Sequence, residues 1–187
     1  MSIIQTVPED EATGEVAALY EDDIAIFGYV SEHAKVMALN PAAANAFDAL
    51  TGAISRSLGV RNYRLVTLAA AGALDSQPCL LSHGLFARKL FDDAQLERIG
   101  RDFHDAELTA AEVAMMDFAV KVCTDAAGMT DADSLVLREH GFTDGQIVDI
   151  ALAAGARNHY SRVLSALGVV DIVPPGMPDE LRSALLG

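Results

Sequence analysis

The spacing of apolar residues is helical along nearly the whole chain, and no segment shows the alternation of polar and apolar residues that marks a strand. Start and stop signals cut this pattern into separate helices. Asn40 followed by Pro41 marks one helix start, and Gly28 marks the end of the first helix. Thr109 and Glu112 have the spacing of a capping box at another start. The sequence therefore predicts an all-α fold.

The same signals predict a single-domain helical bundle. No low-complexity linker and no block of like charge divides the chain. We expect an N-terminal helical segment over 1–58, a core with a cysteine-bearing helix over 59–170, and a C-terminal tail over 171–187. The predicted helices run approximately over 9–27, 31–40, 41–58, 62–74, 76–91, 92–101, 109–123, 130–140, 143–168 and 179–186.

Composition indicates the cellular location of the protein and the kinds of partner it can bind. A chain of 187 residues can bury a substantial core, and 51% hydrophobic residues with a mean hydropathy of +0.26 favour a homo-oligomer. The formal charge of −14 argues against a nucleic-acid partner. No apolar run is long enough to span a membrane, and no signal peptide is expected at the N-terminus. Two cysteines do not make a disulfide scaffold, which favours a reducing, cytoplasmic location.

Cys79 and His83 lie four residues apart at a predicted helix start, so the thiol and the imidazole share one helix face. Ser76 is expected to cap this helix. Pro78 is tolerated only in the first turn, which places Cys79 near the positive end of the helix dipole. A helix N-terminus and a nearby imidazolium both favour the thiolate. The spacing predicts a reactive Cys79 with His83 as its base, and a buried core cysteine is the alternative.

Two segments of the chain, about 60–83 and 129–169, resemble the alkylhydroperoxidase D-like branch of the carboxymuconolactone decarboxylase family. The N-terminal third is similar to the peroxidase-related members of that branch. The resemblance implies a helical bundle of that family's type and assembly into dimers, trimers or hexamers. It rests on Arg61-Asn62-Tyr63-Arg64-Leu65-Val66, Ser76-x-x-Cys79-x-x-x-His83, Gly141-Phe142-Thr143-Asp144, Asn158, Arg162 and Leu167-Gly168-Val169, and in the N-terminal third on Gly28 and Asn40-Pro41.

In catalytically competent relatives the motif is a glutamate, eleven residues, and then Cys-x-x-Cys-x-x-x-His. By this resemblance Cys79 attacks the peroxide and His83 belongs to the proton relay, whereas the resolving cysteine falls on Ser76 and the glutamate on Arg64. Because serine cannot form a disulfide, an external thiol reductant is expected to recover an oxidised Cys79. Arg64 cannot accept a proton. It could instead stabilise a thiolate, bind a substrate carboxylate or make an ion pair.

Three functions are compatible with these residues. The first is a one-cysteine, peroxidase-related oxidoreductase that reduces an organic hydroperoxide with Cys79 as nucleophile and His83 as base. The second is a carboxymuconolactone decarboxylase-like enzyme, whose carboxylated lactone Arg64 could bind. The third is a non-catalytic helical oligomer that binds a small ligand. The long N-terminal segment favours the first, because it resembles the peroxidase-related group.

Other polar and sulfur-bearing residues are expected to be structural. Cys123 has apolar neighbours and is predicted to lie in the core, although it remains an alternative resolving thiol. His159 and Tyr160 are interpreted as helix-packing or interface residues rather than pocket residues. Two acid–histidine pairs are interpreted as solvated, because adjacent residues point away from each other on a helix; they are Glu32-His33 and His104-Asp105.

Neither a metal nor an organic cofactor is expected. Cys79 and His83 supply two potential ligands, and no third lies close in sequence. The chain contains no P-loop, no Gly-x-Gly-x-x-Gly segment after a strand and no Gly-x-Ser-x-Gly elbow. Nucleotide binding and serine hydrolysis therefore have no support.

Overall fold

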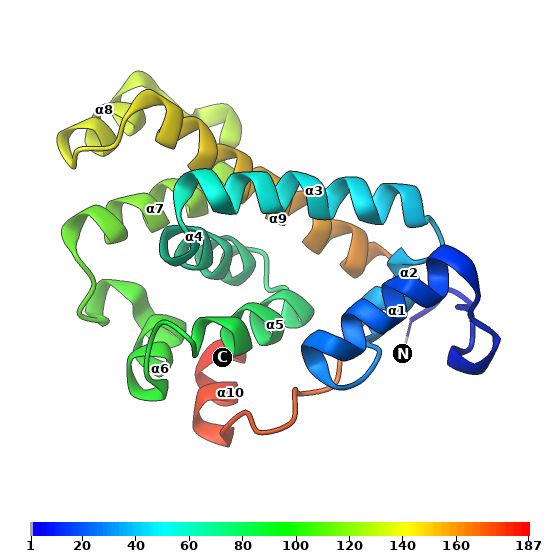
Figure 1. Cartoon of the computed structure of the whole chain (residues 1–187). Coiled ribbons are helices and arrows are strands. Elements are labelled where there is room, and N and C mark those ends of the chain that lie inside the picture. The colour runs from blue at the N-terminus through cyan, green and yellow to red at the C-terminus, as the bar shows by residue number, and fades with distance from the viewer. Residues whose placement is uncertain (1) are drawn as a thin grey trace.

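The computed structural model describes residues 2–187, which form helices and no strand (Figure 1). Three short 3-10 turns, at Glu9–Glu11, Phe103–Asp105 and Ala126–Gly128, accompany the α-helices. The all-α prediction is confirmed for this part of the chain. The α-helices are α1 (Gly14–Phe27), α2 (Glu32–Met37), α3 (Pro41–Leu58), α4 (Val60–Ala73), α5 (Gln77–Ala87), α6 (Asp93–Asp102), α7 (Ala110–Thr124), α8 (Asp131–Glu139), α9 (Asp144–Ala166) and α10 (Asp179–Leu186).

Local capping signals place several of these boundaries where the sequence predicts them. The Asn40 side chain accepts a hydrogen bond from the backbone N–H of Ala43 at the start of α3. Thr109 and Glu112 form the predicted capping box of α7. Gly28 ends α1 with φ +82°, a left-handed conformation that glycine adopts without steric cost.

The largest differences from the predicted bounds are in the first helix and in the cysteine helix, which are both shorter in the structure. The first was expected over 9–27, but extended backbone at Ala12 and Thr13 separates α1 from the turn at Glu9–Glu11. That turn is held to α2 by an ion pair between Glu9 and Lys35, a tertiary contact that no local pattern encodes. The cysteine helix was expected to reach Phe91 but ends at Ala87, because the chain turns there and takes the Phe91 ring into the core.

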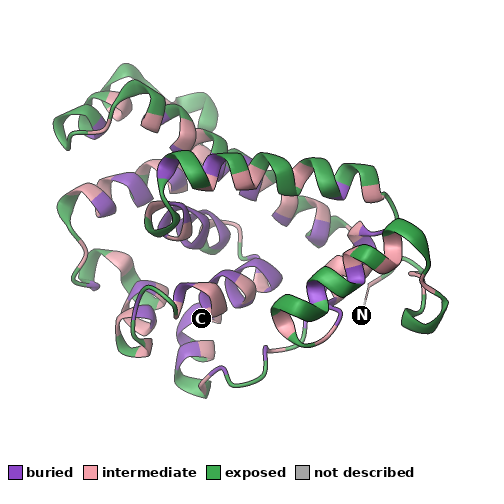
Figure 2. Ribbon diagram, viewed as in Figure 1, coloured by how far each residue is buried: buried purple, intermediate pink, exposed green. Residues whose placement is uncertain are grey.

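The core is built around α4. Most of its length is buried (Figure 2), and it packs against α3, α5, α7 and α9. Leu65 and Val66 are fully enclosed, and they are followed by a run of small residues that lets neighbouring helices approach closely. α4 is therefore the fixed element against which α5 and α9 are positioned.

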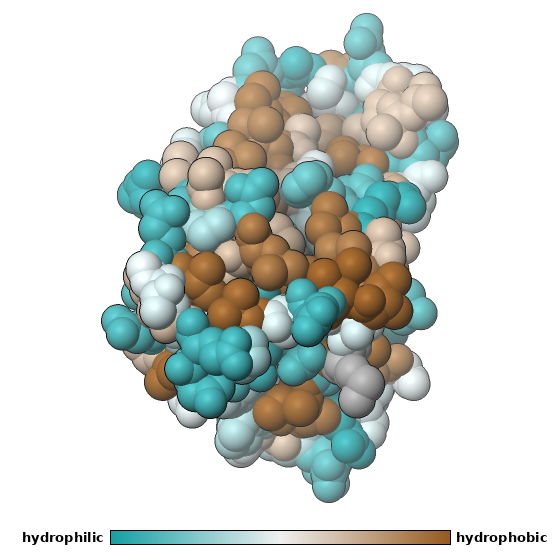
Figure 3. All heavy atoms as spheres, turned by 90° about the vertical axis from the view of Figure 1, so that its right-hand side faces the viewer, coloured by the Kyte–Doolittle hydropathy of each residue, from teal (hydrophilic) through white to brown (hydrophobic). Residues whose placement is uncertain are grey.

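The N-terminal helices α1 and α2 lie at one end of the bundle and have their own small apolar cluster, made by Tyr20, Val30 and Ala38. Asp23 accepts a hydrogen bond from the backbone N–H of Ser31 at 2.6 Å, which ties α1 to the start of α2. Figure 3 faces this end and shows apolar side chains beside hydrophilic ones. No helix within residues 2–187 is long and apolar enough to cross a membrane.

Candidate functional site

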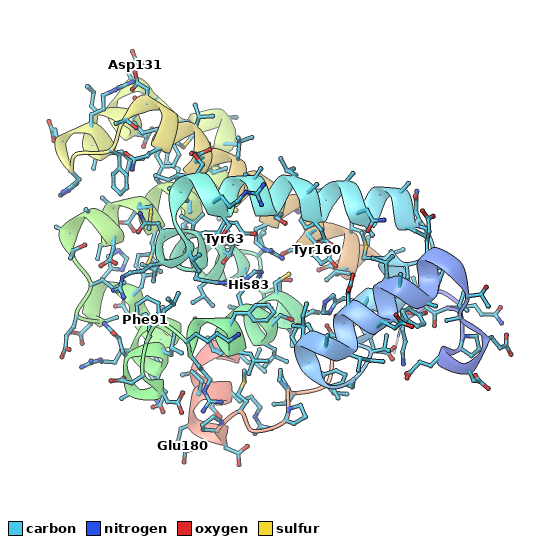
Figure 4. All side chains as sticks on the ribbon, in the orientation of Figure 1. Tyr63, His83, Phe91, Asp131, Tyr160 and Glu180 are labelled. Atoms are coloured by element: carbon cyan, nitrogen blue, oxygen red, sulfur yellow. The ribbon has the colours of Figure 1, made fainter. Side chains whose placement is uncertain are left out.

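A cavity of about 390 Å³ lies where α1, α2 and α3 meet α4, α5 and α9. Aromatic side chains form much of its wall: Phe27, Phe47, Tyr63, Phe86 and Tyr160. Figure 4 shows Tyr63, His83 and Tyr160 in the space between α3 and α5. The volume lies within the range typical of small-molecule sites.

Cys79 lines this cavity from the first turn of α5, with 2% of its surface exposed. Two side chains of α9 donate hydrogen bonds to its sulfur. The Nη1 of Arg157 lies 3.2 Å from Sγ, and the hydroxyl of Ser161 lies 3.4 Å from it. The spacing of four residues puts both donors on the same face of α9. The sulfur is therefore held between α5 and α9 by a cation and a hydroxyl.

Arg157 is a buried cation, only 5% exposed. Burial works against its charge, but the pKa of Arg157 is nevertheless raised, chiefly by the charge of Cys79, with Tyr63, the hydrogen bond to the sulfur and Tyr160 adding to it. Its guanidinium also lies 5.5 Å from the centre of the Tyr160 ring. A buried charge is costly unless it is hydrogen-bonded, and the Cys79 sulfur accepts a hydrogen bond from this guanidinium.

His83 also lines the cavity, and its Nδ1 lies 2.8 Å from Nη1 of Arg64. Because a guanidinium only donates, Nδ1 must accept, and the ring hydrogen is on Nε2. Burial, followed by the charges of Arg157, Arg64 and His33, holds the pKa of His83 well below its usual value. The imidazole is therefore neutral and presents an N–H rather than a basic nitrogen.

Arg64 reaches the cavity from α4 with its guanidinium over the Phe86 ring at 4.6 Å. Burial lowers the pKa of Arg64, and the like charge of Arg157 adds to this effect. The structure thus brings Cys79, His83 and Arg64 to one cavity. Among residues 2–187 no hydrogen bond joins Cys79 to His83.

Ser76 occupies the N-cap position of α5, and its carbonyl accepts the hydrogen bond from the Leu80 N–H. Its hydroxyl, however, makes no cap. The oxygen is buried and has no hydrogen-bond partner in the described chain. The prediction that the Ser76 side chain caps this helix is wrong, because its backbone angles (φ −93°, ψ 87°) depart from those of a capping residue.

Two features of the site were not anticipated from the sequence. Arg157 and Ser161 lie 78 and 82 positions from Cys79 and were not singled out. A signal was nevertheless present, since both interrupt the buried apolar face of α9 with polar groups. Tyr160 lines the cavity, in contrast to its interpretation as a packing or interface residue, whereas His159 is exposed.

His33 was interpreted as solvated, and that interpretation is wrong. Its Nδ1 lies 2.5 Å from a carboxylate oxygen of Asp171, and its backbone N–H donates to the other oxygen. The ring meets Phe27 and Tyr160 edge-on and lines the cavity. The pairing joins residues 138 positions apart, so adjacency on a helix gave no hint of it. His104, by contrast, is exposed, as expected.

Acidic side chains line a different part of the cavity: Asp22 and Asp23 on α1, and Asp48 on α3. The pKa of Asp48 is raised by desolvation and by the charges of Asp22 and Asp23, while His33 opposes the shift. The cavity therefore has a cationic side at α4 and α9 and an anionic side at α1 and α3.

Cys123 lies in the core, as predicted. Its sulfur lies 3.7 Å from the carbonyl oxygen of Ala154, and burial raises the pKa of its thiol to about 11. It is not among the residues that line the cavity. Within residues 2–187 no three histidine, cysteine or acidic side chains are grouped as metal ligands.

Solved structures share this fold. An uncharacterised peroxidase-related protein from Ralstonia eutropha JMP134, described as an alkylhydroperoxidase AhpD core, is 22% identical, with a TM-score of 0.80 over 100% of this chain and 97% of that chain. A peroxidase-related protein from Silicibacter sp. TM1040 is 29% identical, with a TM-score of 0.76 over 90% of this chain and 88% of that chain.

A third structure is a cysteine-to-alanine variant of the debrominase Bmp8 in complex with 2,3,4-tribromopyrrole. It is 15% identical, with a TM-score of 0.75 over 99% of this chain and 98% of that chain. No family model and no curated protein matches the sequence. The structural likenesses confirm the predicted alkylhydroperoxidase D-like fold.

Proposed function

Because the chain has the alkylhydroperoxidase AhpD-like fold, we propose that it is a one-cysteine peroxidase in which Cys79 reduces an organic hydroperoxide. The observation that carries the proposal is the contact between the Arg157 guanidinium and the Cys79 sulfur at 3.2 Å. No carboxylate pairs with Arg157 among residues 2–187, and an uncompensated buried charge is strongly destabilising. A Cys79 thiolate supplies the missing counter-charge.

The thiolate performs the reaction by attack on the outer oxygen of the hydroperoxide. A sulfur–oxygen bond forms as the O–O bond breaks, the sulfur is oxidised, and the alkoxide leaves with both electrons of that bond. A proton from solvent then converts the alkoxide to the alcohol. The products are a sulfenic acid on Cys79 and one molecule of alcohol.

His83 has a different role in this proposal from the one that its spacing to Cys79 suggested. A general base must offer a free lone pair, but Nδ1 accepts from Arg64 and Nε2 carries the hydrogen. Arg157 already favours the ionised sulfur, so no base is needed to deprotonate it. His83 instead donates a hydrogen bond from Nε2 to the oxygen on which negative charge develops.

An external thiol completes the cycle. Ser76 cannot form a disulfide, and Cys123 lies outside the cavity. One small thiol condenses with the sulfenic acid to give a mixed disulfide and water. A second thiol displaces Cys79 from it and leaves as the oxidised disulfide.

The test is to treat the reduced protein with cumene hydroperoxide and a sulfenic-acid trapping reagent, and to locate the adduct by mass spectrometry. We expect the adduct on Cys79 in the wild type and in Cys123→Ser, and no adduct in Cys79→Ser. If Cys79 reacts no faster than free cysteine, the proposal is wrong. The alternative of a non-catalytic ligand-binding oligomer would then be favoured.

A further inference from the structure

The cationic side of the cavity carries two arginines that lack carboxylate partners. Within residues 2–187 every ion pair of an arginine with a carboxylate involves another arginine, and neither Arg64 nor Arg157 takes part in one. Both line the cavity, and each lies within electrostatic range of the other. Two like charges held together at a partly dry site repel each other and attract an anion.

Arg157 also has an unused donor. Its Nε is buried and has no hydrogen-bond partner in the described part of the chain, although the residue is only 5% exposed. A buried N–H left without a partner is destabilising, and more so on a charged group. Arg64 donates one N–H to His83, and its guanidinium has further N–H groups that can donate to a ligand. Arg64 thus has donors for an acceptor that the described part of the protein does not supply.

On the α4 and α9 side of the cavity the charges do not balance without a ligand. Arg64 and Arg157 contribute two positive charges, the Cys79 thiolate contributes one negative charge, and His83 is neutral. One positive charge is left over. We propose that the hydroperoxide reduced by Cys79 is an aryl compound with a single carboxylate, which the arginines bind while the aromatic wall holds the ring. This inference rests on the proposed function, which supplies the Cys79 thiolate. The binding of an anion by the two arginines does not depend on that function.

The wall suits a flat ring. Phe47 and Tyr160 stack with their centroids 4.7 Å apart and their planes at 23°, and Phe27 and Phe86 lie 5.4 Å apart. Offset ring contacts of this kind are favourable beyond the area they bury. A cavity of about 150 Å³ can hold benzene, so the 390 Å³ observed has room for a bicyclic ring and a carboxylate.

The acidic side of the cavity limits the ligand to one carboxylate. The charges that act on Asp48 are those of Asp22, His33 and Asp23, and those that act on Arg64 are Tyr63 and Arg157. The acids are carried by α1 and α3, and the arginines by α4 and α9. A second carboxylate directed toward α1 and α3 would meet like charge, which disfavours a dianion.

The test compares 2-naphthoate with its neutral isostere 2-naphthamide by calorimetry on the full-length protein. Charge-assisted hydrogen bonds contribute about 1.5–3 kcal/mol, so naphthoate should bind at least about 10-fold tighter. Arg64→Gln should abolish this preference. Arg138→Gln, which removes an exposed arginine on α8 far from the cavity lining, should leave it unchanged. Equal binding of the two probes, or a preference that survives Arg64→Gln, overturns the inference.

A second variant separates this inference from the proposed function. Cys79→Ala removes the competing negative charge, so naphthoate should bind more tightly to it than to the wild type, although no thiol chemistry remains. If Cys79 proves unreactive but naphthoate binds with the Arg64 dependence above, the anion site stands and the peroxidase proposal fails. If Cys79 reacts with hydroperoxide but the protein binds naphthoate no more tightly than naphthamide, the substrate class is overturned and the peroxidase proposal stands.

Discussion

The guanidinium of Arg157 lies 3.2 Å from the sulfur of Cys79, although the two residues are 78 positions apart in the chain. The contact joins the first turn of α5 to the middle of α9 across the packed core. It explains how a buried arginine can be accommodated beside a buried cysteine, because the sulfur accepts a hydrogen bond from the guanidinium.

Removing the cation should make Cys79 less reactive. Arg157→Gln is expected to slow alkylation of Cys79 by iodoacetamide at pH 7 by at least about 10-fold. The reason is that losing about 1.4 kcal/mol of stabilisation of the thiolate lowers its population about 10-fold. The rate is followed by mass spectrometry of the Cys79 peptide. Arg162→Gln is the matched control, because Arg162 is an exposed arginine on the same helix. Equal rates in wild type and Arg157→Gln would contradict the role of Arg157.

Ser76 stands where the family motif has its resolving cysteine, and its hydroxyl makes no hydrogen bond in the described structure. Ser76→Cys should therefore lose no interaction and place a thiol one helical turn from Cys79. After one equivalent of cumene hydroperoxide we expect an internal disulfide, measured as the loss of two titratable thiols. Ser134→Cys, on α8, should retain its new thiol. A persistent sulfenic acid in Ser76→Cys would show that the two sulfurs cannot meet.

His83 should make stability depend on pH. Its folded pKa is lowered by burial and by neighbouring cations, so below the unfolded value of about 6.5 the unfolded chain binds the extra proton. Its contribution is therefore present above pH 6.5 and is lost as pH falls, by up to about 1.4 kcal/mol per pH unit.

Urea unfolding between pH 7.5 and 5.5 checks this dependence by comparing wild type with His83→Gln. The variant should lose less stability on acidification. The raised pKa of His104, caused chiefly by its hydrogen bond to Asp102, acts with the opposite sign and is common to both proteins. Identical pH slopes in the two proteins would be evidence against a neutral, buried His83.

The pair between His33 and Asp171 should hold α2 to the C-terminal tail. Asp171→Asn is expected to lower the free energy of unfolding by about 2 kcal/mol, because hydrogen bonds to a charged group contribute about 1.5–3 kcal/mol. Denaturant unfolding measures the loss. Asp179→Asn, an exposed acid at the start of α10, should change stability by no more than about 0.5 kcal/mol. A loss at Asp171 no larger than that would mean that the pair is not structural.

Local sequence predicted the helices well where their signals are local. Asn40, Thr109 and Gly28 act within four residues of themselves, and the structure places the ends of α3, α7 and α1 accordingly. The first helix was predicted too long because the Glu9 ion pair to Lys35 fixes the preceding turn from outside. The helix propensities of single residues do not include a contact between distant parts of the chain.

The features of the candidate site also divide into those that are local in sequence and those that depend on tertiary packing. The sequence by itself determined that Cys79 and His83 share one turn of a helix, and that Ser76 and Arg64 replace the residues expected from the resemblance. Only the tertiary structure decided that Arg157 and Ser161 hold the sulfur, that Arg64 takes the Nδ1 of His83, and that His33 faces the cavity. The reason is that a capping or i to i+4 relation is fixed by backbone geometry, whereas contacts between α4, α5 and α9 depend on how their buried faces pack.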